Sequence, residues 1–140
     1  MRGKILLPIR GVKQKKFCCG PACIEMVLQY YGYKVTQEQV RKEVGVWEQR
    51  GMFPHQVIKY LAKYGIISEK VKRIDVDKYL ETPRPAIIGL KCHFSLLVGK
   101  LNGYLIIIDP AVGRKSIVKR DYLRKVKDYI KIIGVEYEKS

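Results

Sequence analysis

The spacing of hydrophobic positions changes near the middle of the chain. In the first half, apolar residues recur three to four positions apart, which is typical of helices with one buried face. This pattern predicts helices after Pro21, from Thr36 to about Val44, and from Pro54 onwards. Gly32 and Gly65 follow two of them, where a left-handed residue can end a helix. The first half is therefore expected to be mainly helical.

From Ile66 onwards, short apolar runs bounded by turn residues replace the helical spacing and predict strands. Asn102-Gly103 is a hairpin signal between two of these runs. The expected strands are 66–74, 86–91, 93–100, 104–109 and 130–137, with a lead-in strand at 4–7, a short helix between Asp75 and Glu81, and a basic helix over 120–129 with Tyr122, Leu123 and Val126 inward. Helices followed by antiparallel strands predict an α+β fold, in one domain over 1–140.

Composition indicates the cellular compartment in which this domain is expected. No segment approaches the roughly 20 apolar residues that cross a bilayer, and the apolar run near the N-terminus is too short for a signal peptide. Three of the four cysteines fall within six residues, and two of them are adjacent, which is not a secreted disulfide framework. These features indicate a soluble cytoplasmic protein.

The formal net charge of +15 favours anionic partners. Basic residues gather before Cys19, around residues 70–73 and along residues 114–127. A nucleic acid would be attracted by such charge, but no helix-turn-helix, zinc-finger or RNA-binding motif accompanies it. The charge is also what a lysine-rich soluble protein carries, and it could attract an acidic peptide.

Four residues form a candidate catalytic set. Cys19 lies just before the expected start of the first helix, and the partial positive charge of a helix N-terminus favours the nucleophilic thiolate. His93, which starts a strand, can act as the base, and Asp109, which ends the next strand, can orient it. Gln14 and the backbone N–H of Cys19 can bind a developing oxyanion.

The same residues carry a family resemblance. The sequence resembles the bacteriocin-processing cysteine peptidases, papain-like domains that cut double-glycine leader peptides, from about Val12 to the C-terminal region. The matching features are Gln14, the block Cys19-Gly20-Pro21-Ala22-Cys23 with the helix to Gly32, the run His93-Phe94-Ser95-Leu96-Leu97-Val98, and Ile107-Ile108-Asp109-Pro110. The Asp follows the His by sixteen residues.

The resemblance implies a fold, an activity and a site. The fold would be papain-like, with N-terminal helices packed on a C-terminal antiparallel sheet. The activity would be a thiol peptidase cleaving after small residues, of the Gly-Gly leader type, in a stand-alone domain whose partners are a peptide substrate and a separate transporter. Cys19 would be the nucleophile, His93 the base, Asp109 the orienting acid and Gln14 the oxyanion donor, with no cofactor and no metal.

Other interpretations of these residues stay open. A papain-like domain can bind a peptide without cleaving it, and a basic module on this scaffold can bind nucleic acid. Cys18 can form a disulfide or fill space, Cys23 and Cys92 are expected in the core, and His55 on the surface. Cys19, Cys23, Cys92 and His93 together supply zinc-type ligands, although adjacent strand residues reach a single metal poorly.

The hairpin between the strands of His93 and Asp109 gives an internal test. With a strict two-residue turn at Asn102-Gly103, Leu101 would face Tyr104 and His93 would face Val112. That register separates His93 from Asp109. A longer loop pairing Val98 with Tyr104 would place His93 opposite Asp109, so we expect such a loop or a β-bulge.

Overall fold

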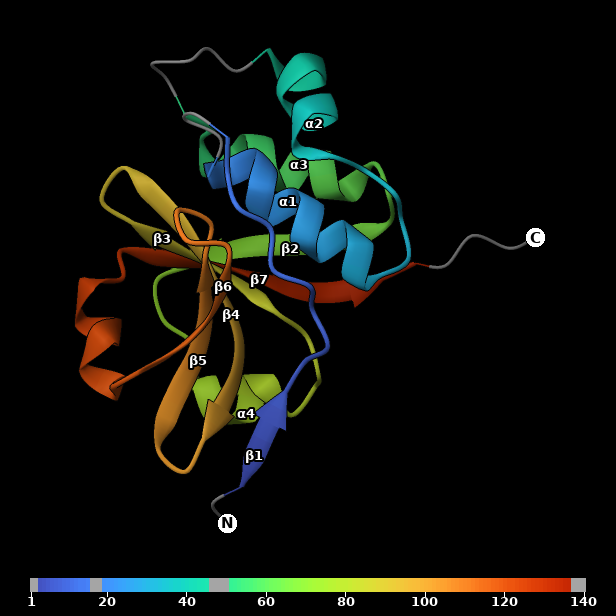
Figure 1. Ribbon diagram of the computed structural model, residues 1–140. Coiled ribbons are helices and arrows are strands. Elements are labelled where there is room, and N and C mark those ends of the chain that lie inside the picture. The colour runs from blue at the N-terminus through green and yellow to red at the C-terminus, as the bar shows by residue number, and fades with distance from the viewer. Residues whose placement is uncertain (1–2, 16–18, 46–50, 137–140) are drawn as a thin grey trace.

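The computed structural model describes residues 3–15, 19–45 and 51–136, with most of the helices in the first half and most of the strands in the second (Figure 1). The helices are α1 (Cys19–Tyr30), α2 (Gln37–Val44), α3 (Pro54–Ala62), α4 (Val76–Leu80) and a 3-10 helix, η1 (Arg120–Lys125). The strands are β1 (Lys4–Leu6), β2 (Ile66–Val71), β3 (Ala86–Leu90), β4 (His93–Leu101), β5 (Tyr104–Asp109), β6 (Arg114–Val118) and β7 (Asp128–Val135).

The strands form one sheet in the order β2-β7-β3-β4-β5-β6, and β1 pairs with β4 beside this path. Every pairing in it is antiparallel, and the α+β prediction is confirmed. The central strands β3, β4 and β5 are buried along most of their length. The residues at the ends of these strands are therefore the ones that become accessible to solvent.

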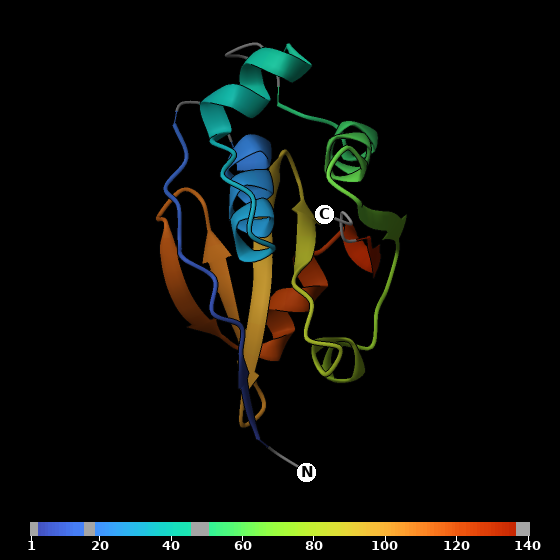
Figure 2. The same cartoon turned by 90° about the vertical axis from the view of Figure 1, so that its right-hand side faces the viewer.

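The sheet has a hydrophobic core on each face. On one face α1, α2 and α3 gather, as Figure 1 shows, and Figure 2 shows α1 in front of the central strands. The buried side chains of α1 (Ile24, Val27 and neighbours) pack there with sheet residues such as Leu96 and Ile108. On the other face Val76 and Leu80 of α4 pack with Leu97 and Leu105. The larger core holds α1 rigidly above β4, which sets the position of its first residue.

Local signals place most helix ends as expected. The Thr36 hydroxyl accepts a hydrogen bond from Gln39 N at the start of α2, and Asp75 accepts one from Lys78 N at the start of α4. Gly32 and Gly65 have positive φ beyond the ends of α1 and α3. Cys19 is itself the first residue of α1, whereas the sequence placed it just before the helix.

Two parts of the second half differ from the expectation. The predicted helix over 120–129 is wrong: a 3-10 helix covers only Arg120–Lys125, and β7 begins at Asp128. The strand β6 was not expected, since it carries exposed polar residues and no alternation that marks a buried face. Cys18 and Trp47 lie outside the described residues. Among the helices of the described part, none is long and apolar enough to cross a membrane.

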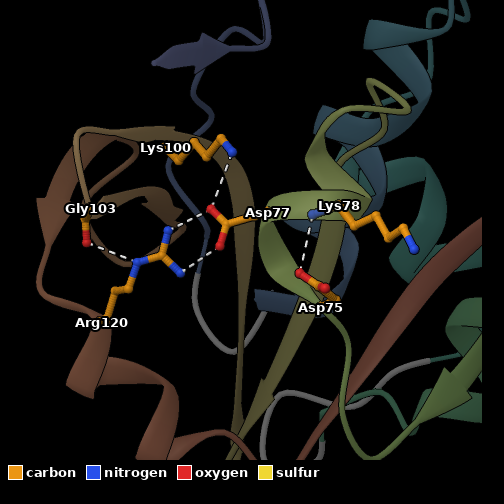
Figure 3. A network of polar contacts seen from close by, with 6 residues as sticks. All are labelled: Asp75, Asp77, Lys78, Lys100, Gly103 and Arg120. Atoms are coloured by element: carbon orange, nitrogen blue, oxygen red, sulfur yellow. Dashed lines mark hydrogen bonds and ion pairs between the residues drawn. The ribbon is translucent and has the colours of Figure 1, made fainter. Parts of the chain in front are cut away.

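A polar network fastens η1 to α4 and to the β4–β5 hairpin (Figure 3). Asp77 of α4 accepts two hydrogen bonds from the Arg120 guanidinium, at 3.1 and 2.6 Å, and pairs with Lys100 Nζ at 3.2 Å. Arg120 Nε also donates to the carbonyl of Gly103 in the hairpin turn, at 2.9 Å. One carboxylate therefore joins three segments on the face of the sheet opposite α1.

Candidate active site

A cavity of about 600 Å³ opens where the N-terminal ends of α1 and α3 meet the sheet. Gln14, Cys19 and His93 all lie on its wall, so the structure brings three of the four candidate residues together. The remaining wall is formed by Gly51, Met52, Phe53 and Pro54 on one side, and by Gly89, Leu90, Cys92, Phe94, Lys127 and Asp128 on the other. Asp109 lies outside the cavity wall and is bonded to the ring of His93.

The position of Cys19 follows from the way α1 begins. The following residues Gly20 and Pro21 are buried, and a Cβ at Gly20 would be in close contact with the Met52 side chain. The glycine thus lets the helix start pack tightly against the loop before α3. The first N–H groups of a helix have no partner within it, so Cys19 stands at the end of α1 that is rich in hydrogen-bond donors.

His93 and Asp109 form the pair that the sequence predicted. His93 Nε2 lies 2.7 Å from Asp109 Oδ1, and the same oxygen accepts a hydrogen bond from Ala111 N at 2.9 Å. The backbone bond fixes the carboxylate at the end of β5. Since Nε2 is engaged with Asp109, Nδ1 is the ring nitrogen left to face the Cys19 sulfur.

The electrostatics of His93 reflect both neighbours. A hydrogen bond with the Cys19 side chain is the largest influence, and together with the bond to Asp109 it raises the pKa of His93 to about 9. Burial of the ring acts in the opposite direction. The imidazole is therefore held as imidazolium at neutral pH, next to a thiol and a carboxylate.

A β-bulge sets the register of His93 and Asp109. The hairpin has the strict turn, with Leu101 paired to Tyr104, but Val98 is an extra residue between the pairs Leu97–Ile107 and Gly99–Ile106. The expectation of a bulge is confirmed, and that of directly opposed residues is wrong. Continuing the register from Leu97 places His93 two residues diagonally from Asp109 on the same face, which long side chains can bridge.

Gln14 is held by the loop that follows Asp109. The backbone N–H of Gln14 donates to the carbonyl of Pro110 at 2.7 Å. Gly11 and Gly113 allow this close approach, because a Cβ at Gly11 would collide with the Gly113 carbonyl and one at Gly113 with the backbone of Lys13. The side-chain Oε1 of Gln14 is buried and has no hydrogen-bond partner within the described residues.

The other cysteines occupy different environments. Cys23 is fully buried in the core, and burial raises the pKa of its thiol well above the ordinary value. Cys92, expected in the core, is exposed in the turn between β3 and β4, where its φ is 57°. Both are free, as is Cys19. Within the described ranges no group of three or more His, Cys, Asp or Glu side chains could hold a metal, which leaves the zinc interpretation without a ligand set.

Sequence reasoning missed several residues of the cavity wall. Lys127 and Asp128 were assigned to a helix, but they enter β7 beside Gly89, and the N–H of Lys127 donates to the Gly89 carbonyl at 2.8 Å. A Cβ at Gly89 would collide with the carboxylate of Asp128. Only the apolar run after Asp128 signalled a strand there, and nothing local marked Gly89 as part of a site.

The layout defines a class of protein. A cysteine at the start of a helix, packed on an antiparallel sheet whose histidine meets a carboxylate, is the papain-like arrangement. The chain belongs to the Peptidase C39 family, whose sequence model matches residues 11–133. Membership of this family supports a cysteine peptidase. No curated protein matches the chain closely enough to count as a relative.

Solved structures share the fold over nearly the whole chain. The peptidase domain of Streptococcus ComA, a bi-functional ABC transporter involved in quorum sensing, superposes with a TM-score of 0.76 at 20% identity, covering 90% of this chain and 98% of that domain. A double glycine motif protease from an AMS/PCAT transporter, solved with its leader peptide, has a TM-score of 0.76 at 26% identity, covering 96% of both chains. A C39-like peptidase described as putative, from Bacillus anthracis, has a TM-score of 0.72 at 14% identity, covering 96% and 99%.

Proposed function

We propose that residues 1–140 form a single peptidase domain that cleaves peptide bonds after small residues, of the Gly-Gly leader type. Cys19 is the nucleophile, His93 the general base and acid, Asp109 the orienting acid and Gln14 the oxyanion donor. The observation that carries the proposal is the position of His93 between two partners. Its Nε2 lies 2.7 Å from Asp109 Oδ1, and its ring also forms a hydrogen bond with the Cys19 side chain. A solvated or purely structural histidine has no need of both partners.

The reaction follows from these positions. The Cys19 thiolate attacks the scissile carbonyl carbon, and the carbonyl electron pair moves to oxygen, where the Gln14 amide and the Cys19 N–H donate to it. His93 as imidazolium gives its proton to the leaving amine as the C–N bond breaks. Water then attacks the thioester while His93 takes its proton, and the C–S bond breaks to release the acid and restore the thiolate.

The preference for small residues is supported by likeness to a solved protease whose cleavage motif is stated. The solved relative that carries a leader peptide is a double glycine motif protease, and it is 26% identical to this chain. The natural substrate would then be the leader of a secreted peptide, with a transporter as the second partner.

A reducing compartment such as the cytoplasm suits this chemistry. The described cysteines Cys19, Cys23 and Cys92 are free, and the mechanism needs Cys19 as a thiolate. The basic character of the chain would also favour an acidic segment in the peptide.

The decisive experiment is to profile a peptide library with the wild-type protein and with Cys19→Ala. We expect cleavage after Gly-Gly or similar small pairs by the wild type, and none by Cys19→Ala. Iodoacetamide labelling of Cys19 below neutral pH, located by peptide mapping, should fall steeply in His93→Ala. Peptide capture without cleavage by the wild type would instead identify a binding domain and refute the peptidase.

A further inference from the structure

The segment that carries Gln14 is clamped by a side chain distant in sequence. The amide of Gln37 accepts a hydrogen bond from Lys15 N at 2.8 Å and donates one to the Lys13 carbonyl at 2.9 Å. The side-chain amide of Gln37 thus makes the two hydrogen bonds, one accepted and one donated, that the backbone of a neighbouring β-strand would make with this segment. The two bonds fall on either side of Gln14, which lies on the wall of the cavity.

A second contact holds the same segment from another direction. Gln14 N donates to the carbonyl of Pro110 at 2.7 Å, next to Asp109. The backbone around Gln14 is therefore fixed by three hydrogen bonds, two to Gln37 and one to Pro110. Removal of the two Gln37 bonds would leave the backbone beside Gln14 held by the Pro110 bond and the packing on Gly113, with an exposed ion pair between Lys15 and Glu38 at 2.9 Å.

Gln37 is itself well anchored. It is the first residue of α2, it is only 6% exposed, and its N–H donates to Glu25 Oε1 of α1 at 2.6 Å. The helix that begins with Cys19 therefore holds α2 through Glu25, and α2 holds the segment of Gln14 through Gln37. This chain of contacts connects the helix that begins with Cys19 to the segment that carries Gln14.

We propose that Gln37 is a positioning residue for the oxyanion donor, acting through the backbone on both sides of Gln14. This inference depends on the proposed function, since it assigns Gln37 a part in that mechanism. A buried amide with satisfied hydrogen bonds also stabilises a fold. The two roles differ in one measurable respect: only a positioning role disappears when Gln14 is removed.

The test uses two probes of Cys19 with different requirements. A peptide aldehyde ending in Gly-Gly adds the Cys19 sulfur to its carbonyl carbon, and the resulting oxygen occupies the oxyanion site. Iodoacetamide is displaced at carbon by the thiolate and forms no oxyanion. Each probe is applied to the full chain as wild type, Gln37→Leu, Gln37→Glu and Gln39→Leu, and to Gln14→Ala with and without Gln37→Leu.

Gln37→Leu keeps the size of the side chain and removes both hydrogen bonds. Loss of a whole oxyanion donor costs about 100- to 1000-fold in rate, so a displaced one is expected to weaken aldehyde binding by roughly tenfold. Alkylation by iodoacetamide should be unchanged. Gln37→Glu can still accept from Lys15 N but cannot donate to the Lys13 carbonyl, and an intermediate loss is expected. Gln39→Leu, on the same helix with its amide bonded to Glu43, should match the wild type.

The double variant separates positioning from stability. In the Gln14→Ala background, Gln37→Leu should cause no further loss of aldehyde binding, although urea unfolding shows the same destabilisation in both backgrounds. An equal loss in both backgrounds, or no loss from Gln37→Leu in the wild type, would overturn the inference while leaving the peptidase intact. If the wild type shows neither alkylation of Cys19 near neutral pH nor aldehyde binding, the proposed function fails and the inference fails with it.

Discussion

Gln14 donates its backbone N–H to the carbonyl of Pro110 at 2.7 Å, so the N-terminal segment and the loop after β5 meet directly beside the cleft. Asp109, the neighbour of Pro110, bonds to His93. The proposed oxyanion donor and the proposed base are thus attached to one loop, and changes at this contact should affect both.

Gly11→Ala should separate the two segments, because the new Cβ would collide with the carbonyl of Gly113. Backbone atoms cannot yield as a flexible side chain does, so we expect a loss of about 1–3 kcal/mol in the free energy of unfolding, together with a lower kcat. Urea denaturation and peptide cleavage measure the two effects. Gly3→Ala is the matched control, since a Cβ there meets nothing within 4 Å. Equal behaviour of the two variants would contradict the close contact.

Asp109→Asn should lower kcat by about 100-fold, within the range typical of general acid–base catalysis. The amide keeps the shape of the carboxylate but no longer stabilises the His93 imidazolium. Steady-state cleavage of a Gly-Gly peptide measures the loss, and Asp121→Asn, which changes an exposed acid in η1, serves as the control. Full activity in Asp109→Asn would rule out Asp109 as the orienting acid.

The pH profile of cleavage should have an alkaline limb. The hydrogen bond to Cys19, followed by that to Asp109, raises the pKa of His93 to about 9, and the leaving amine needs the proton of the imidazolium. Activity is therefore expected to fall as the pH rises through about 9. In Asp109→Asn the limb should move to lower pH, since the charge that stabilises the imidazolium is gone. If the alkaline limb does not move in Asp109→Asn, Asp109 does not influence the group that titrates there.

The same shift has a consequence for stability. A histidine whose pKa is raised on folding stabilises the fold fully below its unfolded value of about 6.5, and this contribution is lost as the pH rises through the folded value. The melting temperature of the wild type should thus approach that of His93→Ala between about pH 6.5 and pH 9. A constant difference across this range would show that the charge of His93 is not coupled to folding.

Asp77→Ala should destabilise the network shown in Figure 3. It leaves Lys100, which is 8% exposed, without the carboxylate that it shares with Arg120, and the expected loss in unfolding free energy is about 1–2 kcal/mol. Glu69→Ala is the control, because its carboxylate is about as exposed as that of Asp77 but pairs with Lys131 at the longer distance of 3.5 Å.

Acid titration provides a second measurement on Asp77. Its hydrogen bond to Arg120 is the largest influence that lowers the pKa of its carboxyl. A lowered pKa stabilises the fold above the unfolded value of about 3.9, and the contribution is lost as the pH falls through the folded pKa. The difference between wild type and Asp77→Ala should therefore shrink below about pH 4. A difference that persists there would assign the loss to packing.

Residues with strong local signals were predictable from the sequence. Thr36 and Asp75 cap their helices through their own side chains, and Cys19 precedes a proline suited to a first helical turn. For the register of His93 and Asp109, the sequence predicted only that an irregularity must bring the two residues close together. The hairpin signal indicated a strict turn and the chemistry demanded proximity, and the bulge at Val98 satisfies both.

Features that depend on distant contacts were not predictable. Tyr122, Leu123 and Val126 have helical spacing, but Val126 is extended and the chain turns into β7, where pairing with β3 outweighs local preference. Gln37 looks like any polar residue at a helix start, because its partners lie 22 and 24 residues away. No pattern within a short window reports such a contact.

The bond between Gln14 and Pro110 has a consequence during synthesis. Cys19 is synthesised early, but Pro110, whose carbonyl holds the proposed oxyanion donor, is made some ninety residues later. A chain still emerging from the ribosome would carry the sulfur without the rest of the machinery. The proposed site could therefore form only in a chain whose synthesis has passed Pro110.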